Sequence, residues 1–447
     1  MLRTILPSFL SLVSCLWAGD EAVPGRGPLQ LSMKRAVELA TSPEGNTNIQ
    51  LADEAVRQAQ ARVKQARSAF LPNVDGTAGE QNVVQNLVAQ GLTDFKLPLG
   101  IRLPSRVGPY NSVAIQATAS ELVDLSLIRR WQSAKTSVHA SKSERDDADE
   151  RIAGVVAKAY VAALRARANL EAVHADVTLA EALLKQAENE KNAGTGTGID
   201  VTRNKVQVAN ERQRELVAQN EQNRTQFELL RTIGLRLDTS LEFTDKLEFL
   251  PMEPTTLEEA KAEAMKSRAD LKAQQEKEDS ARLSASAVRM EQLPSITAFG
   301  NYGSNGSGLD GVMLPTRAVG ASLKIPVFDS GRRSGRRAEA NSQYRQEKIR
   351  TADLMAQIEL DLRESLDSMH SATEQLQVAK DGLALSENEL AQAQRRYSAG
   401  VANGVEVTDA QTRLERAREN QIDALFNYNV ARVNLGQAEG ILRRIIQ

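Results

Sequence analysis

Strict alternation of apolar with polar or small side chains marks residues 113–120 and 319–327 as β-strands, each with one apolar face. Weaker alternation over residues 73–84 and 295–302 predicts a partner strand ahead of each. We therefore expect two β-hairpins, with a glycine-rich loop over residues 303–315 in the second hairpin.

Two very long helices are predicted to follow the hairpins. Residues 334–399 contain no proline and only two glycines, and they are mostly Ala, Gln, Glu, Leu and Arg. A helix of that length spans roughly 100 Å at 1.5 Å per residue, which is too long for an ordinary globular domain. Residues 125–193 have the same character, and glycine-rich turns at 194–198 and 400–404 end the two long helices.

Shorter helices are expected before each hairpin and after each glycine turn. Entry helices are predicted at residues 31–70, with an interruption at 41–46, and at 257–292, and return helices at 199–234 and 405–446. One entry and one return helix together span ~114 Å, close to the ~104 Å of one long helix. Stacked end to end, they would flank a long helix over its whole length. All strands would then lie at one end of the body and both glycine turns at the other.

The chain is an internal duplication, a feature that outweighs its length as a guide to domain count. Three residues around the first glycine turn recur at the same spacing around the second: Gly194, Gly198 and Asp200, then Gly400, Gly404 and Glu406. The predicted organisation is a first repeat over 31–234, a linker or equatorial segment over 235–256, and a second repeat over 257–446.

Residues 1–19 have the short basic start and the apolar stretch of a signal peptide. Cys15 is the single cysteine, so no disulfide within the chain is expected. The four residues ending at Cys15 fit the bacterial lipobox, in which the cysteine is acylated; ordinary cleavage near Ala18 or Gly19 is the alternative and discards it. Under both interpretations the protein is exported. Residues 20–30 are expected to form an extended tether.

Composition narrows the class of protein further. The net charge is −2 and the pI about 6.1, so no general affinity for nucleic acid is implied. Aromatic residues make up only 4% of the chain, which suits thin layers of closely packed helices better than a thick core. No segment after the leader approaches the ~20 apolar residues of a membrane-spanning helix. Any part of the mature protein that enters a membrane must therefore do so as strands.

Four strands in one chain cannot close a membrane barrel. Open strand edges are not tolerated in lipid, and the smallest known membrane barrels have about eight strands. Several subunits must then contribute strands. The alternative is a small water-exposed sheet capping a helical bundle, as in a periplasmic coiled-coil scaffold or an adaptor-like protein without a pore.

The motif over residues 326–333, the turn over 396–400 and the helix start over 405–410, taken with the duplicated element order, resemble the TolC-like outer-membrane efflux proteins. The resemblance implies a mainly α fold with a small membrane β part. Three chains form a homotrimeric 12-stranded β-barrel in outer-membrane lipid, which continues into a long periplasmic α-helical barrel. It also implies the exit duct of a tripartite efflux or type I secretion system, with an inner-membrane transporter and a periplasmic adaptor as partners. No catalysis and no cofactor are implied.

The resemblance places functional residues at the periplasmic tip. Glu406 and Asp409 match the acidic ring of the pore entrance. Crowded carboxylates around a narrow axis attract cations and raise one another's pKa. The alternative is that both are ordinary acids of a first helical turn, where the helix dipole favours negative charge.

The resemblance also assigns a gate and an adaptor contact. Asp200 and Tyr397 match positions of the lock that keeps the tip shut, and Gly194 and Gly400 match the small-residue clefts that accept adaptor hairpins. The best-known member of the family has an arginine in this lock, where the present chain has Ala402. We therefore expect gating to depend on Tyr397 and on packing.

Other functional patterns lack their required context. The glycines of 194–198 follow a helix and lack the lysine and hydroxyl of a phosphate-binding loop. The basic run 331–337 belongs to an exported protein, so nucleic acid is not expected as a partner. His139, His174 and His370 lack metal-ligand spacing, and no catalytic arrangement is identifiable. The exported substrate cannot be inferred, because a wide aqueous duct discriminates little.

Overall fold

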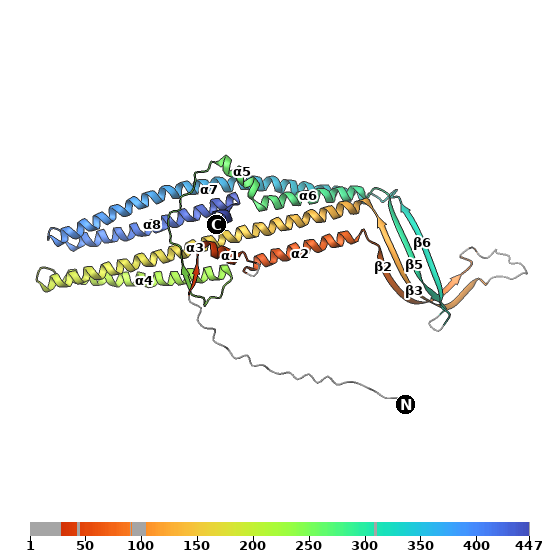
Figure 1. Cartoon of the computed structure of the whole chain (residues 1–447), viewed down its shortest axis with the longest axis horizontal. Coiled ribbons are helices and arrows are strands. Elements are labelled where there is room, and N and C mark those ends of the chain that lie inside the picture. The colour runs from red at the N-terminus through yellow and green to blue at the C-terminus, as the bar shows by residue number, and fades with distance from the viewer. Residues whose placement is uncertain (1–27, 43–44, 90, 92–103, 308–310, 447) are drawn as a thin grey trace, which may run out of the picture.

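The computed structural model describes residues 28–42, 45–89, 91, 104–307 and 311–446. The chain forms a long body of side-by-side helices with an antiparallel sheet at one end (Figure 1). The predicted signal peptide and Cys15 lie outside the described residues. The helices are α1 (Met33–Ala40), α2 (Thr47–Ser68), α3 (Leu125–Asn192), α4 (Gly198–Ile233), α5 (Leu257–Ser267), α6 (Ala269–Met290), α7 (Arg332–Ser398), α8 (Gly404–Glu439) and α9 (Leu442–Ile446).

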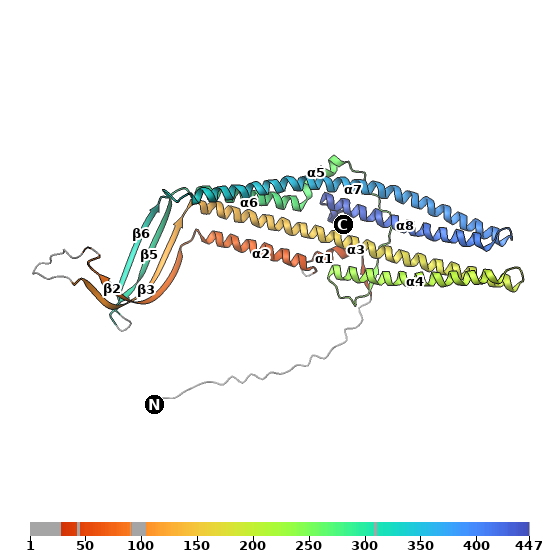
Figure 2. The same ribbon diagram turned by 180° about the vertical axis from the view of Figure 1, so that it is seen from behind.

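The helices form four columns in one layer. The long helix α3 packs against α2 and α4 on one side and against α6 and α8 on the other, and α7 packs against α6 and α8. Figures 1 and 2 show α2 in line with α4 and α6 in line with α8. The end-to-end stacking expected from the helix lengths is confirmed, and the strands and the two glycine turns lie at opposite ends of the body. Within the described residues, no helix combines the length and apolar character that crossing a bilayer needs.

One antiparallel sheet contains both hairpins, in the order β2-β3-β5-β6. Cross-strand partners share a face of a sheet, so the register gives one mainly apolar face and one mainly polar face. The apolar face includes Val74, Ile115, Ala117, Ile296, Ala298, Val319 and Leu323. The polar face includes Asp75, Thr77, Gln116, Thr118, Thr297, Asn301 and Ser322. The strands are β2 (Asn73–Asn86), β3 (Arg106–Val123), β5 (Ser295–Gly306) and β6 (Leu314–Lys324).

The second hairpin differs from its prediction. β5 and β6 extend into the segment 303–315 that was expected to be a loop, because backbone pairing continues through its glycine and serine residues. The last strand was predicted to reach residue 327, but β6 ends at Lys324. Pro326 has no backbone N–H to donate to the sheet, which explains the earlier end.

The second entry helix was predicted to be continuous over 257–292, but it breaks at Arg268, whose backbone is extended (φ −65°, ψ 118°). The last return helix likewise ends at Gly440 (φ 71°) and does not continue to residue 446. These two breaks touch. A Cβ at Gly440 would lie 3.0 Å from the Arg268 Cα, and Arg268 Nη1 donates to the Ala438 carbonyl at 3.2 Å. The Arg268 side chain therefore caps α8, an interaction that local propensity does not predict.

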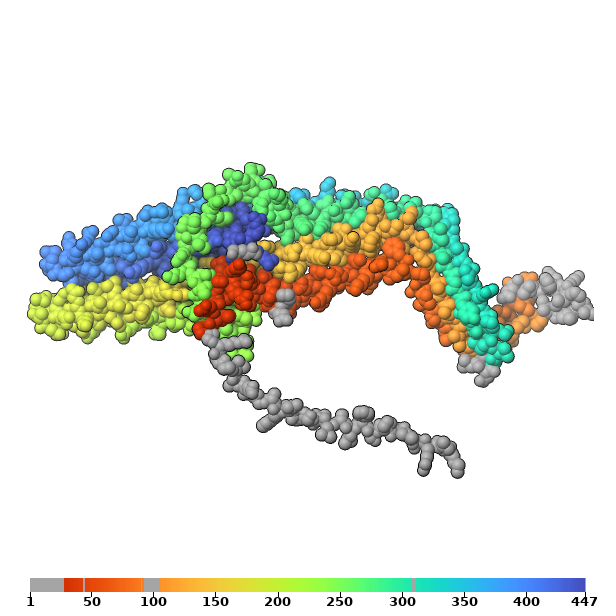
Figure 3. All heavy atoms as spheres, viewed as in Figure 1, coloured from red at the N-terminus to blue at the C-terminus, as the bar shows by residue number. Residues whose placement is uncertain are grey.

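A belt of short elements surrounds the middle of the body. β1 (Leu29–Leu31) pairs in parallel with β4 (Leu241–Phe243), and Figure 3 shows the segment that contains β4 crossing the helices. The hydroxyl of buried Tyr160 on α3 donates to the Leu31 carbonyl at 2.8 Å, and its ring meets Phe243 edge-on at 5.5 Å. The belt is therefore fixed to the long helix by a buried hydrogen bond and by aromatic packing.

Candidate functional site

The two glycine turns have the same backbone design. Gly194 and Gly400 have positive φ angles of 79° and 71°, and the residue after each glycine donates its N–H back to the end of the preceding long helix at 3.0 Å. This closure of a helix C-terminus strongly favours glycine. A Cβ added at either position would meet no atom within 4 Å, so both turns are open to contact from another molecule. The adaptor contact at these glycines stays a prediction.

Each return helix begins with a side-chain cap and an acidic residue. Thr197 accepts a hydrogen bond from the Asp200 N–H at 3.3 Å, and Asn403 accepts one from the Glu406 N–H at 3.2 Å. Asp200 and Glu406 thus occupy equivalent first-turn positions, where the helix dipole stabilises a carboxylate.

The predicted gate residues lie close together at the tip. A Cβ at Gly404 would lie 3.4 Å from Asp200 Oδ1 and 3.8 Å from the Tyr397 ring, so both residues flank this glycine. Tyr397 nevertheless donates its hydroxyl to Glu190 Oε2, at 2.6 Å. Burial raises the pKa of Tyr397 to about 12, with added contributions from Glu190 and Asp200.

Sequence reasoning missed two residues of this tip cluster. Arg203 Nη1 lies 3.0 Å from Asp200 Oδ1, and the spacing of three residues on one helix is a local signal that could have identified the pair. Glu190 gave no such signal, because Tyr397 lies far from it in the sequence. Ala402 itself offers no cation at the tip, but Arg203 and Arg396 both lie beside the turns and pair there with acidic residues.

The two predicted ring residues have different surroundings. Glu406 Oε1 lies 3.0 Å from Arg396 Nε, in an ion pair that crosses the turn from α7 to α8. Asp409 is exposed, and within the described part of the chain no cationic group forms an ion pair with it. The pair at Glu406 is too exposed to stabilise the fold by much, but Arg396 offsets part of the negative charge at this end of the body.

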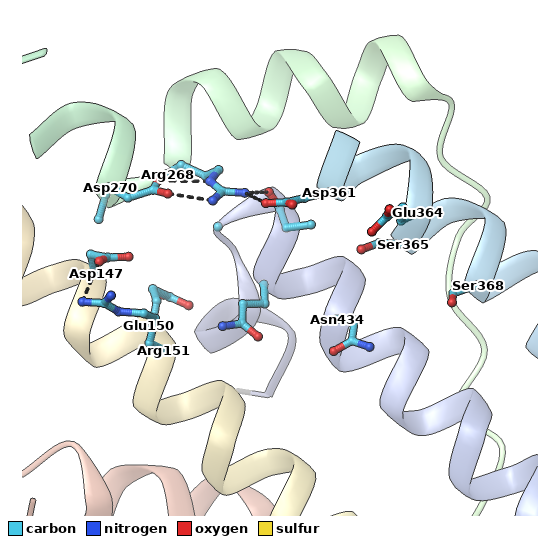
Figure 4. Close-up of a pocket in the computed structure, with 14 residues that line it drawn as sticks. Asp147, Glu150, Arg151, Arg268, Asp270, Asp361, Glu364, Ser365, Ser368 and Asn434 are labelled. Carbon is cyan, nitrogen blue, oxygen red and sulfur yellow. Dashed lines mark hydrogen bonds and ion pairs between the residues drawn. The ribbon is translucent and has the colours of Figure 1, made fainter. Parts of the chain in front are cut away.

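A separate cavity of about 490 Å³ lies at the middle of the body, where the Arg268 break meets α3, α7 and α8 (Figure 4). Arg268 pairs with Asp270 at 2.7 Å and with Asp361 at 3.4 Å, and Asp147 pairs with Arg151 at 3.0 Å. Five acidic residues and two arginines line the cavity, so these pairs leave an excess of negative charge. Its position beside Arg268 and Gly440 makes the cavity part of the junction of the broken helices. Across the described ranges, no group of three or more His, Cys, Asp and Glu side chains is placed to hold a metal ion.

Comparison with known proteins identifies the family. Residues 41–235 and 261–440 match the family described as outer membrane efflux protein, which includes both glycine turns and all four strands of the large sheet. The chain belongs to the outer membrane efflux protein family. As a member, it is an efflux channel of the outer membrane with a periplasmic extension, and the family is one of transport ducts rather than of enzymes.

Relatives of this efflux protein cover most of its length. It is 26% identical over 397 residues to the outer membrane protein TolC of Vibrio cholerae, covering 85% of this chain and 84% of the relative. It is also 26% identical to the pyoverdine export outer membrane protein OpmQ of Pseudomonas putida, with coverages of 86% and 81%. The open state of the Neisseria gonorrhoeae MtrE outer membrane channel has the same fold, with a TM-score of 0.77 at 18% identity and coverages of 93% and 90%.

Proposed function

We propose that this efflux protein is a homotrimer whose sheets together close a 12-stranded barrel in the outer membrane. The observation that carries the proposal is the four-stranded sheet itself. β2 and β6, the two edges, each pair on one side only, and open edges are not tolerated in lipid. One face of the sheet is mainly apolar and the other mainly polar, as a barrel with lipid outside and water inside requires. Exceptions include Glu121 and Arg317 on the first face and Leu122 and Phe299 on the second.

The helical body supports edge-to-edge assembly. The outer columns expose large apolar side chains along their length: Leu51 on α2, Val206, Leu216, Val217 and Phe227 on α4, and Ile349, Leu360, Val378 and Leu385 on α7. The inner columns add Val155 and three residues close to helix starts, Leu125, Ile128 and Val405. Apolar surface at both edges of one layer is expected where identical layers join side by side. Three layers joined in this way form the α-barrel.

The tip supplies the entrance and its gate. Glu406 and Asp409 line the entrance of the trimer, and Tyr397 and Asp200 hold the tip shut. A periplasmic adaptor docks near the open turns at Gly194 and Gly400 and joins the duct to an inner-membrane transporter, which selects the cargo. The likeness to an export protein such as OpmQ supports a tripartite assembly, and family membership favours the duct over a scaffold without a pore.

Extraction and mass measurement test this proposal. The full-length protein should resist salt extraction from outer membranes, dissolve in detergent, and have the mass of a trimer by light scattering. Because the apolar face of the barrel would meet lipid, charged substitutions on it (V319K with A321K) should prevent the trimer, whereas S322K on the polar face of the same strand should not. A monomer or dimer that leaves the membrane with salt would overturn the proposal.

A further inference from the structure

A buried cluster of charged residues joins the two helical hairpins above the tip. It consists of Asp176 on α3, Glu211 and Arg214 on α4, and Glu415 and Arg418 on α8. The three acidic residues are almost inaccessible to solvent, with exposed fractions of 2% for Asp176, 1% for Glu211 and 8% for Glu415. Buried carboxylates are rare unless they are paired or perform a function. We call this set the hairpin cluster.

Two side chains of α4 bridge to α8 in the cluster. Arg214 Nη1 lies 2.9 Å from Glu211 Oε2 and 3.1 Å from Glu415 Oε2. Gln207 Nε2 donates to Glu211 Oε1 at 2.7 Å and to Glu415 Oε1 at 3.4 Å. Two carboxylates from different repeats therefore share the same two donors.

The cluster has one more acid than base. Arg418 pairs with Asp176 across α8 and α3, which leaves Arg214 alone to balance both Glu211 and Glu415. The cluster is therefore negative by one charge when all its carboxylates are ionised, and neutral when one of them holds a proton. A net buried charge between two elements favours their separation.

The duplication does not account for the cluster. When the repeats are aligned on Gly194 and Gly400, Glu211 corresponds to Ala417, and Glu415 corresponds to Ala209. Each acid thus corresponds to an alanine in the other copy, of which Ala417 is buried and Ala209 is exposed. Their placement is specific to the contact between the two hairpins.

We propose that the hairpin cluster is a second lock, which holds the α7–α8 hairpin against the α3–α4 hairpin when one of its carboxylates is protonated and loosens when all are ionised. The inference rests on the proposed gated duct, since separating the hairpins is what would widen the tip. The tip contact between Tyr397 and Glu190 is a different contact between the same hairpins.

The surroundings of Glu415 support this mechanism. Its pKa is raised to about 7, mainly by burial and then by the nearby carboxylates of Glu211 and Asp176, with Arg214 acting in the opposite direction. On its own helix Arg418 is held by Asp176, and the side chains of Arg416 and Glu419 are exposed to solvent. On α7, Glu389 is paired with Arg413 of α8.

The direction of the pH effect follows from the raised pKa. The packed cluster binds a proton that a hydrated carboxylate, with its ordinary pKa near 4.5, would release. Acid therefore favours the packed hairpins, and the preference is lost as the pH rises through about 7. For one protomer, one linked proton changes the ratio of packed to separated hairpins by up to about tenfold per pH unit.

The distance between the hairpin tips measures this equilibrium directly. Nitroxide labels on T195C and V401C in the full-length protein would report it by pulsed electron resonance at about pH 5.5 and about pH 8, on either side of the transition. We expect a narrow, short distance distribution in acid and a broader, longer one in base. E415Q, which mimics the protonated acid, should keep the narrow distribution at both pH values.

Two further variants keep the test decisive. R214Q removes the shared cation, so its distance distribution at about pH 8 should be broader than that of the unsubstituted protein. In acid, the distribution of R214Q should still become narrow. R224Q is the matched control, because Arg224 forms an exposed pair with Glu221 on the same helix. A pH response in E415Q equal to that of the unsubstituted protein, or R214Q behaving as R224Q does, would overturn the second lock.

Conductance of the same proteins in lipid bilayers separates this inference from the proposed function. Channels whose open probability follows the measured tip distance support both. Absence of any conductance in trimeric protein refutes the duct, and the distance measurement then still decides whether the cluster holds the hairpins together. Conductance that is independent of pH in every variant overturns the second lock while leaving the duct intact.

Discussion

The tips of the two helical hairpins, at Gly194 and at Gly400, share a backbone conformation but differ in the pattern of their charged residues. When they are aligned on Gly194 and Gly400, Glu190 corresponds to Arg396 and Arg203 corresponds to Asp409, while the first-turn acid is kept as Asp200 and Glu406. Each tip therefore has two acids and one base, with the base in a different place. In the first tip Arg203 neutralises Asp200 from the same helix, and in the second Arg396 neutralises Glu406 across the turn.

This exchange leaves a different acid without an arginine partner in each tip. In the first repeat Glu190 is free to accept the Tyr397 hydroxyl, so the spare acid holds the two hairpins together. In the second repeat the spare acid is Asp409, which faces solvent. The two repeats share the glycine, the cap and the first-turn acid, and they differ in which acid has no arginine partner. We propose that this difference gives the first tip a role in closure and the second a role in attracting cations.

Of the substitutions that test the difference between the tips, removing the Tyr397 hydroxyl should have the largest effect. Y397F removes the donor to Glu190 Oε2, while Gln186 still donates to Oε1, and losing a hydrogen bond to a charged group costs about 1.5–3 kcal/mol. We expect the open probability of single channels in bilayers to rise by roughly tenfold to a hundredfold. Y344F, on the same helix but far from the tip, is the control. An open probability unchanged by Y397F would refute a closing role for the spare acid of the first tip.

Alanine at the two turn glycines should show that their backbones are equivalent. G194A and G400A each place a Cβ at a positive φ angle in open space, so each should destabilise the protein by about 1–2 kcal/mol, and by similar amounts. G382A, in the middle of α7 with free space around it, should instead stabilise by up to about 1 kcal/mol. Denaturant midpoints for the three variants measure this, and clearly unequal losses at the two turns would show that the turns differ in more than charge.

Charge-neutral substitutions should distinguish the two acids of the second tip. Because Arg396 offsets Glu406, D409N should lower the cation preference of the channel more than E406Q does, and R396Q should raise it. Reversal potentials in a salt gradient measure the preference, with R416Q on α8 as a control for charge far from the turn. Equal preferences in all these variants would remove the acidic ring from the entrance.

Much of the fold follows from local signals in the sequence. The positions of glycine and proline predict the turns, and their scarcity over long stretches predicts α3 and α7. These signals are local, because both residues act directly on the backbone wherever they occur. The break at Arg268 had no such signal, since Ser267, Arg268 and Ala269 are compatible with a helix. It depends on the close approach of Gly440, from the far end of the repeat.

The residues of the candidate site likewise divide into those that local sequence predicts and those that it does not. Asp200 and Glu406 could be placed at helix starts from the cap residues ahead of them, and the turns from their glycines. Glu190 and the hairpin cluster could not be predicted, because their partners come from different repeats and only the packing of α3, α4 and α8 brings them together.

The belt at the middle of the body has a mechanical consequence. Only the two long helices run through that level without a break, whereas their neighbours start or stop there. Beyond the belt, toward the glycine turns, one helical hairpin can therefore tilt relative to the other about the belt, with an arm the length of one return helix. That arm has 36 residues, or ~54 Å, so a tilt of about 5° moves the tip by about 5 Å. Such a tilt of one hairpin relative to the other is large enough to separate Tyr397 from Glu190, whose hydrogen bond is 2.6 Å long.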